Sequence, residues 1–203
     1  MAVATAMIAV LGGCGGPDVG APAPSGPSTP STPSAPSGSR PAERGVAEIA
    51  VGGPDCLADE VLAALEIGDA SDSGSGRPAP KAGSIPRGFE PVRVVECRGG
   101  PGFPAGSVAS KARATVREVT LSGDLGPLLA ALSRASEAPR ADQACIAMFE
   151  FKPQIYLVDA RGRAVRPSWP VDACGFLHDD ARPALAGLSE TGSTELVVGQ
   201  SKG

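Results

Sequence analysis

The stretch QIYLVDARGRAVR, residues 154–166, decides the fold class. Its first part, residues 154–158, is an apolar run that we expect to form a strand. Residues 159–162 place Asp159 first and Gly162 fourth in a tight turn, and residues 164–166 then return as a second strand. The stretch therefore predicts a β-hairpin, whose two strands run antiparallel.

Further strands are expected on both sides of this hairpin. Residues 91–97 (PVRVVEC) alternate in polarity after Pro91, which suits the first position of a strand. Residues 108–121 alternate polar and β-branched side chains, a pattern typical of a strand with one exposed face. Residues 145–151 and 194–198 complete the expected set of strands.

The clearest helix follows a leucine pattern with the spacing i, i+3, i+4 and i+7, formed by Leu125, Leu128, Leu129 and Leu132. Ser122 or Asp124 is expected to cap this helix. Pro127 fits its first turn, where a missing N–H costs nothing.

Two weaker helix patterns complete the prediction. One runs from Asp55, a plausible cap, through Ile67, and a short one follows Asp179 or Asp180. Together these patterns predict an α+β fold with a small antiparallel sheet of about five strands and two or three helices.

The cysteine content predicts two disulfides in this domain. Its four cysteines are Cys56, Cys97, Cys145 and Cys174, and four cysteines allow three connectivities. We prefer Cys56–Cys97 and Cys145–Cys174, because each pair joins elements that are neighbours along the chain. A zinc site is the alternative, but no Cys-x-x-Cys pair is present and there is only one histidine, so no metal or other cofactor is expected.

The N-terminus reads as an export and anchoring signal. Residues 2–11 (AVATAMIAVL) have the length of the apolar core of a signal peptide, although no basic residue precedes them. The following Leu11-Gly12-Gly13-Cys14 resembles the lipobox of bacterial lipoproteins. That resemblance implies cleavage before Cys14, diacylation of its thiol (palmitate being a typical acyl group) and attachment to the outer face of the cell membrane, where two acyl chains give stable anchoring.

The remaining domain organisation follows from composition. Of the 31 residues 15–45, 22 are Pro, Gly, Ser or Thr, which cannot bury enough apolar surface to fold. We therefore expect a signal peptide at 1–13, a lipid-anchored disordered linker at 14–45, a domain at 46–199 and a tail at 200–203. Within the domain, the low-complexity residues 68–84 are expected to be a flexible loop.

Scattered positions of the domain resemble secreted or lipid-anchored proteins of high-GC Gram-positive actinobacteria for which no activity is known. The positions are Pro86-x-Gly88-Phe89-x-Pro91-Val92 leading to Cys97, Asp124-Leu125-x-x-Leu128, Cys145, Asp159-x-x-Gly162 and Pro170-x-Asp172-x-Cys174. The resemblance covers roughly residues 85–175 and implies an exported location.

Overall composition excludes some function classes. The chain carries 18 basic and 22 acidic residues, a net charge of −4, which argues against a nucleic-acid partner. It has only seven aromatic residues (5 Phe, 1 Trp and 1 Tyr), too few for a platform that stacks bases or sugars. No apolar run approaches the roughly 18 residues of a membrane-spanning helix.

Two groups of side chains are candidate sites. Arg161, Arg163 and Arg166, with Trp169 nearby, form a local basic cluster that is either a solvated face or a patch for an anionic cell-wall polymer. His178 is either a general base, oriented by a neighbouring aspartate, or a surface residue beside a helix cap.

No Gly-x-Ser-x-Gly motif is present to supply a nucleophile for His178, so no catalytic residue is assigned. The sequence thus favours a lipid-anchored extracytoplasmic protein that binds or scaffolds a cell-wall polymer or surface protein without catalysis. A cell-envelope hydrolase using His178 is the alternative.

Overall fold

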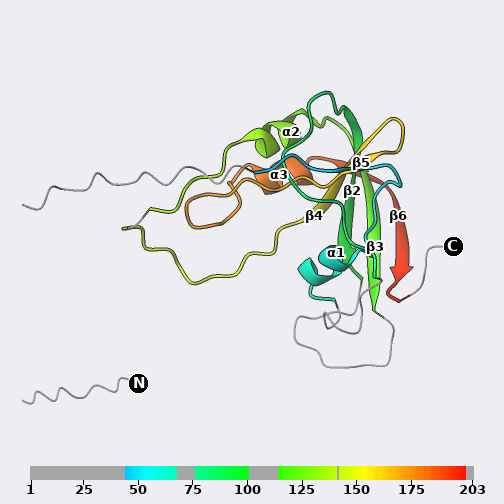
Figure 1. Cartoon of the computed structure of the whole chain (residues 1–203), viewed down its shortest axis with the longest axis horizontal. Helices are drawn as coiled ribbons and strands as arrows, with labels where there is room; N and C mark the ends of the chain where they lie inside the picture. Colours follow the sequence, from blue (N-terminus) through cyan, green and yellow to red (C-terminus); the bar gives the residue numbers. More distant parts are fainter. Residues whose placement is uncertain (1–43, 68–75, 101–113, 141, 200–203) are drawn as a thin grey trace, which may run out of the picture. The chain divides into compact units, whose positions relative to one another are not determined.

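The hairpin expected at residues 154–166 is present and belongs to a larger antiparallel sheet (Figure 1). In the computed structural model, which describes residues 44–67, 76–100, 114–140 and 142–199, strand β4 (Gln154–Asp159) is followed by the short strand β5 (Ala164–Val165). The carboxylate of Asp159 closes the turn by accepting hydrogen bonds from the backbone N–H groups of Arg161 and Arg163, both at 2.9 Å.

The sheet has six strands in the order β1-β5-β4-β2-β3-β6, and every neighbouring pair is antiparallel. The remaining strands are β1 (Ile49–Ala50), β2 (Pro91–Gly99), β3 (Thr115–Ser122) and β6 (Ser189–Val197). The α+β class and the small antiparallel sheet are therefore confirmed, with one strand, β1, that the sequence did not reveal because it is only two residues long.

Three helices are present among the described residues: α1 (Asp59–Ala64), α2 (Gly126–Ser133) and α3 (Ala181–Ala186). Helix α2 has Pro127 in its first turn, and the carboxylate of Asp124 accepts a hydrogen bond from the N–H of Gly126 at 2.9 Å. The prediction that Asp55 caps the first helix is wrong. Asp55 accepts from the N–H groups of Leu57 and Ala58 in a turn that precedes α1.

The strand alternation divides the core into two layers. On one face of the sheet, Val94, Val119 and Leu157 pack in a cluster that includes Leu128 of α2 and Leu185 of α3. On the other face, a second cluster joins α1 to the sheet, and its buried sheet members are Val95, Cys97, Val116, Tyr156, Val158 and Ala164. Both layers are built from the side chains that the alternation of β2 and β4 directs to opposite faces.

Both predicted disulfides are confirmed. Cys56–Cys97 joins the turn before α1 to strand β2, with a Cα–Cα distance of 5.4 Å. Cys145–Cys174 joins the segment before β4 to a turn that follows β5, with a Cα–Cα distance of 5.5 Å. Of the three connectivities that four cysteines allow, the structure has the one that links neighbouring elements.

The chain enters the domain through Arg44, the first described residue. Its guanidinium donates to the backbone oxygens of Leu132 and Ser168, at 3.2 and 2.7 Å, and also to that of Arg134. Leu132 and Arg134 lie at the C-terminal end of α2, whose free carbonyl groups attract a cation. The domain thus makes ordered contacts from residue 44 onward.

The remaining boundaries lie partly outside the described residues. The expected signal peptide and the linker up to residue 43, including Cys14, lie outside the described residues. So do residues 68–75 of the expected loop, residues 108–113 of the strand expected at 108–121, and the tail at 200–203. Residues 76–84 of the expected loop are hydrogen-bonded to the domain, for example through Gly83, whose N–H donates to Arg166 O at 3.1 Å. Within the described ranges, no helix combines the length and the apolar character of a membrane span.

Candidate functional site

The most unusual surface of the domain is the stretch that leads into β4, residues 145–151, which we call the apolar segment. The side chains of Ile146, Met148, Phe149 and Phe151 are 67%, 65%, 75% and 50% exposed. Figure 1 shows the chain between α2 and β4 running out from the sheet before it returns to form β4. Large apolar side chains are normally buried, and a group of them on a surface marks an interaction site.

The expectation that residues 145–151 form a strand is wrong. The N–H of Met148 donates to the carbonyl of Ile146 at 2.9 Å, which closes a three-residue turn at Ala147. A turn of this kind bends the backbone out of the extended conformation that a sheet requires. The apolar residues also occupy both 148 and 149, so no single face of a strand could bury them.

The N-terminal end of the apolar segment is fixed by covalent and polar contacts. Cys145 is bonded to Cys174, and the side-chain amide of Gln143 donates to the Cys174 sulfur at 3.2 Å. Cys174 is itself held in a tight turn, because the Asp172 carboxylate accepts hydrogen bonds from the N–H groups of Cys174 and Phe176, both at 2.9 Å.

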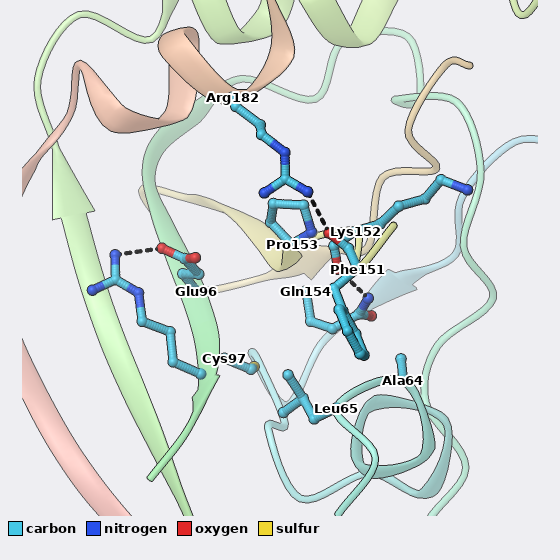
Figure 2. A pocket seen from close by; sticks show the side chains of 10 residues that line it. Ala64, Leu65, Glu96, Cys97, Phe151, Lys152, Pro153, Gln154 and Arg182 are labelled. Atoms are coloured by element: carbon cyan, nitrogen blue, oxygen red, sulfur yellow. Dashed lines mark hydrogen bonds and ion pairs between the residues drawn. The ribbon is translucent and has the colours of Figure 1, made fainter. Parts of the chain in front are cut away.

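The C-terminal end is fixed by an ion pair. The Glu150 carboxylate accepts from the N–H of Leu177 at 2.7 Å and pairs with the Arg182 guanidinium at 3.2 Å. Arg182 also donates to the carbonyl of Phe151 at 2.7 Å, as Figure 2 shows. Residues 146–149 therefore bridge two anchors, both of which are made to the stretch 172–182.

A shallow groove lies beside the apolar segment. Its two neighbouring hollows, of about 280 and 330 Å³, share the lining residues Glu96, Arg98, Pro153 and Arg182, and Phe151 lines the first (Figure 2). The groove exists because the pairing of β4 with β2 ends at Gln154 and Cys97, so the last residues of β2 extend beyond β4. Phe151 joins the apolar segment to the groove, and we treat the two together as the candidate surface.

The charged groups of the groove already have partners. Arg98 lies 2.6 Å from Glu96 and 3.5 Å from Glu190, and Arg117 lies 3.3 Å from Glu190. The hydrogen bond to Glu96 raises the pKa of the Arg98 guanidinium further above its usual range. Because these charges neutralise one another, the groove offers hydrogen bonds and apolar contact rather than a strong field for an ion.

The three arginines of the predicted basic patch lie in different environments. Arg161 is exposed at the β4–β5 turn, Arg163 pairs with Asp159 at 2.7 Å, and Arg166 donates to the Gln154 side chain at 3.1 Å. Trp169 is only 9% exposed, and its indole N–H donates to the carbonyl of Pro153 at 2.7 Å. A role for the three arginines in binding a wall polymer stays a prediction, whereas Trp169 has a structural role in the core.

His178, the candidate general base, lies inside the domain. It is 9% exposed, and its Nε2 atom is buried without a hydrogen-bond partner among the described residues. The neighbouring Asp180 pairs with Arg134 at 3.0 Å. Among the described residues, the His178 side chain therefore makes no hydrogen bond to a carboxylate that would orient it or to a hydroxyl that it would activate.

The described residues hold no group of three or more His, Cys, Asp or Glu side chains arranged to ligate a metal. Comparisons of the chain with protein-family models, with curated proteins and with solved structures found no match.

The sequence did not reveal the apolar segment as an exposed surface, because its apolar content is equally typical of a core strand. The adjacent Met148 and Phe149, which break strand alternation, were the available signal.

Proposed function

We propose that this chain is a lipid-anchored extracytoplasmic protein whose domain binds a protein partner at the cell surface without catalysis. The observation that carries the binding role is the apolar segment, in which four large apolar side chains are at least half exposed while the chain is fixed at both ends. The lipobox-like Leu11-Gly12-Gly13-Cys14 supports the anchored location.

The energetics of the apolar segment support association. Complete burial of one Leu-, Phe- or Met-sized side chain stabilises a complex by about 1.5–3 kcal/mol. Because residues 146–149 are already anchored at both ends, a partner orders little additional chain when it binds them. Several such side chains in one place form the apolar centre that is typical of a protein–protein interface.

The binding role can be tested by site-specific photocrosslinking in intact cells. A photoreactive amino acid at Met148 is expected to give a discrete crosslinked protein, because this side chain would lie at the centre of the interface. The same probe at Val51, which is 82% exposed outside the apolar segment, provides the control. The Phe149→Asp substitution should reduce the Met148 crosslink, and equal crosslinking from both positions would contradict the proposal.

Anchoring is tested separately. Cys14→Ser removes the thiol that would accept the diacylglyceryl group, so the variant should lose labelling by radioactive palmitate and leave the membrane fraction. Persistent palmitate labelling of the Cys14→Ser protein would exclude this cysteine as the lipid attachment site. The binding role of the domain does not depend on this result.

A further inference from the structure

We infer that the apolar segment enters the substrate cleft of a serine endopeptidase with an apolar specificity pocket and stays there as an inhibitor. This inference rests on the proposed function, because it names the class of protein that the segment binds. The inference follows from three features of the segment: its free backbone, its two anchors and the chemistry of its side chains.

The first feature is the exposed backbone that follows the turn at Ala147. Within the described part of the chain, residues 146–149 make a single hydrogen bond, from the Met148 N–H to the Ile146 carbonyl. Among the described residues, the backbone N–H and carbonyl groups of Phe149 have no hydrogen-bond partner, so they are available to a bound protein. An endopeptidase binds its substrate in this way, through main-chain hydrogen bonds to one chain and pockets for its side chains.

The second feature is the pair of anchors. The Cys145–Cys174 disulfide and the Glu150–Arg182 ion pair hold the two ends of residues 146–149 on one stretch of the domain, 172–182. A flexible substrate loses conformational freedom when it enters a cleft, whereas this segment is already held at both ends before it binds. Preorganisation of this kind increases affinity, and protease–inhibitor interfaces change shape little on binding.

The third feature is the chemistry of the exposed side chains. Phe149 is 75% exposed and is followed by Glu150, the residue that carries the second anchor. An aromatic side chain in this position matches the hydrophobic slot of chymotrypsin-like specificity pockets. We therefore assign Phe149 to the pocket and the Phe149–Glu150 peptide bond to the position of attack.

The anchors also explain why the complex would resist turnover. Attack of the protease serine oxygen on the Phe149 carbonyl carbon breaks the bond to the Glu150 nitrogen, which receives a proton from the protease histidine. An ordinary substrate then loses its amine fragment, and water hydrolyses the acyl-enzyme to a free carboxylate. Here the Leu177 N–H and Arg182 hold Glu150 beside the acyl group, so its amine reverses the step and restores the peptide bond.

Other occupants fit the segment less well. An anionic membrane requires a cluster of basic residues, whereas residues 140–152 carry two basic and two acidic side chains and so have no net positive charge. Pairing along a sheet edge, including that of a second copy, requires several consecutive extended residues, and the turn at Ala147 leaves too few of them. A protease cleft pairs with only the few residues on either side of the bond that is attacked. These occupants are therefore outcomes that the experiment must distinguish.

The test measures inhibition of chymotrypsin and subtilisin by the intact protein, with a chromogenic peptide as the competing substrate. The wild-type chain is expected to inhibit, and Phe149→Asp to weaken inhibition on the order of a hundredfold, as for a central interface residue. Val51→Asp, the matched exposed control, should inhibit as the wild type does. Phe149→Arg should lose inhibition of chymotrypsin and gain inhibition of trypsin, whose pocket is acidic.

A second variant tests the role of the anchors. Arg182→Gln keeps Phe149 and replaces a guanidinium that is 53% exposed, so the fold is expected to persist. This variant should still bind chymotrypsin but be cut after Phe149 much faster than the wild type, as mass spectrometry of the digest can show. Equal cleavage rates would contradict the role assigned to the Glu150–Arg182 anchor.

The inference is overturned if the wild type inhibits none of these proteases, if it is cut as fast as a flexible peptide, or if the segment instead binds vesicles of anionic lipid or a second copy. In those cases the crosslinking result decides the proposed function independently. A discrete Met148 crosslink without protease inhibition leaves the binding role intact and excludes only this class of partner. Absence of both removes the two proposals together.

Discussion

Tyr156 links strand β4 to the turn that precedes α1 through its hydroxyl group. Its ring is fully buried in strand β4, and its hydroxyl donates to the carbonyl of Asp55 at 3.0 Å. Burial, which disfavours the phenolate, raises the pKa of Tyr156 to about 12. The folded state therefore holds the phenolic proton more tightly than the unfolded chain, whose tyrosine has a pKa of about 10.

This difference predicts a pH-dependent loss of stability. Below pH of about 10 the group is neutral in both states, and as the pH rises from about 10 to 12 only the unfolded state is deprotonated, which favours unfolding. The loss should reach about 2–3 kcal/mol near pH 12. Urea unfolding of the wild type and Tyr156→Phe at pH 8 and pH 11 checks this, because the variant should lose less stability over that interval. Parallel losses would show that Tyr156 is not responsible.

At the scale of residues, the sequence revealed chemical type but not surroundings. Trp169 and His178 were candidates because tryptophan and histidine are frequent in sites, yet both are 9% exposed. Their burial results from packing between residues that are distant in the chain, such as Trp169 against Pro153. No local pattern around either residue indicates that packing.

The helix α2 shows how reliable a long apolar period is at the scale of elements. Leu128 is completely buried and Leu129, its neighbour on the helix, only partly. Leu128→Ala should therefore lower the free energy of unfolding by about 2–5 kcal/mol. Leu129→Ala removes the same atoms from a less buried position and should cost clearly less. Chemical denaturation of both variants measures the difference, and equal losses would mean that the assigned face of α2 is wrong.

Elements with strong local signals were predicted and elements without them were not. The β4–β5 hairpin has a turn that its own Asp159 stabilises, so the local sequence is sufficient to specify it. Strand β1 pairs only through Ile49 and Ala50, too short a stretch to show alternation. The strand expected at 145–151 failed because apolar content alone does not distinguish a core strand from an exposed segment.

For the whole molecule, the two disulfides have different surroundings and should contribute differently. Cys56 and Cys97 are 0% and 2% exposed within the α1 cluster, whereas Cys145 lies on the exposed apolar segment. Loss of either crosslink costs roughly 3–4 kcal/mol by the chain-entropy argument. The double variant Cys56→Ala/Cys97→Ala also leaves a cavity in the core and should be the less stable of the two.

Thermal unfolding of this variant and of Cys145→Ala/Cys174→Ala provides the comparison. The second variant should retain the core and lose mainly the fixed geometry of residues 146–149, which limited proteolysis can detect as faster cutting between the former cysteines. A larger loss of stability from the second variant would contradict the division of roles between the two bridges.

The candidate surface as a whole was not predictable from the sequence. The pairing of Cys145 with Cys174 was inferred correctly, but the sequence does not reveal that Arg182, 32 residues beyond Glu150, provides the second anchor. The groove likewise depends on where β4 stops pairing with β2, which is a property of the register and not of any motif.

The location of residues 146–149 between two anchors affects how freely these residues can change during evolution. None of the four belongs to either core cluster, so replacing them leaves the packing of the sheet and helices unchanged. Selection can therefore alter the side chains at these positions without endangering folding. We expect chains that share this framework of cysteines to differ most at these four positions.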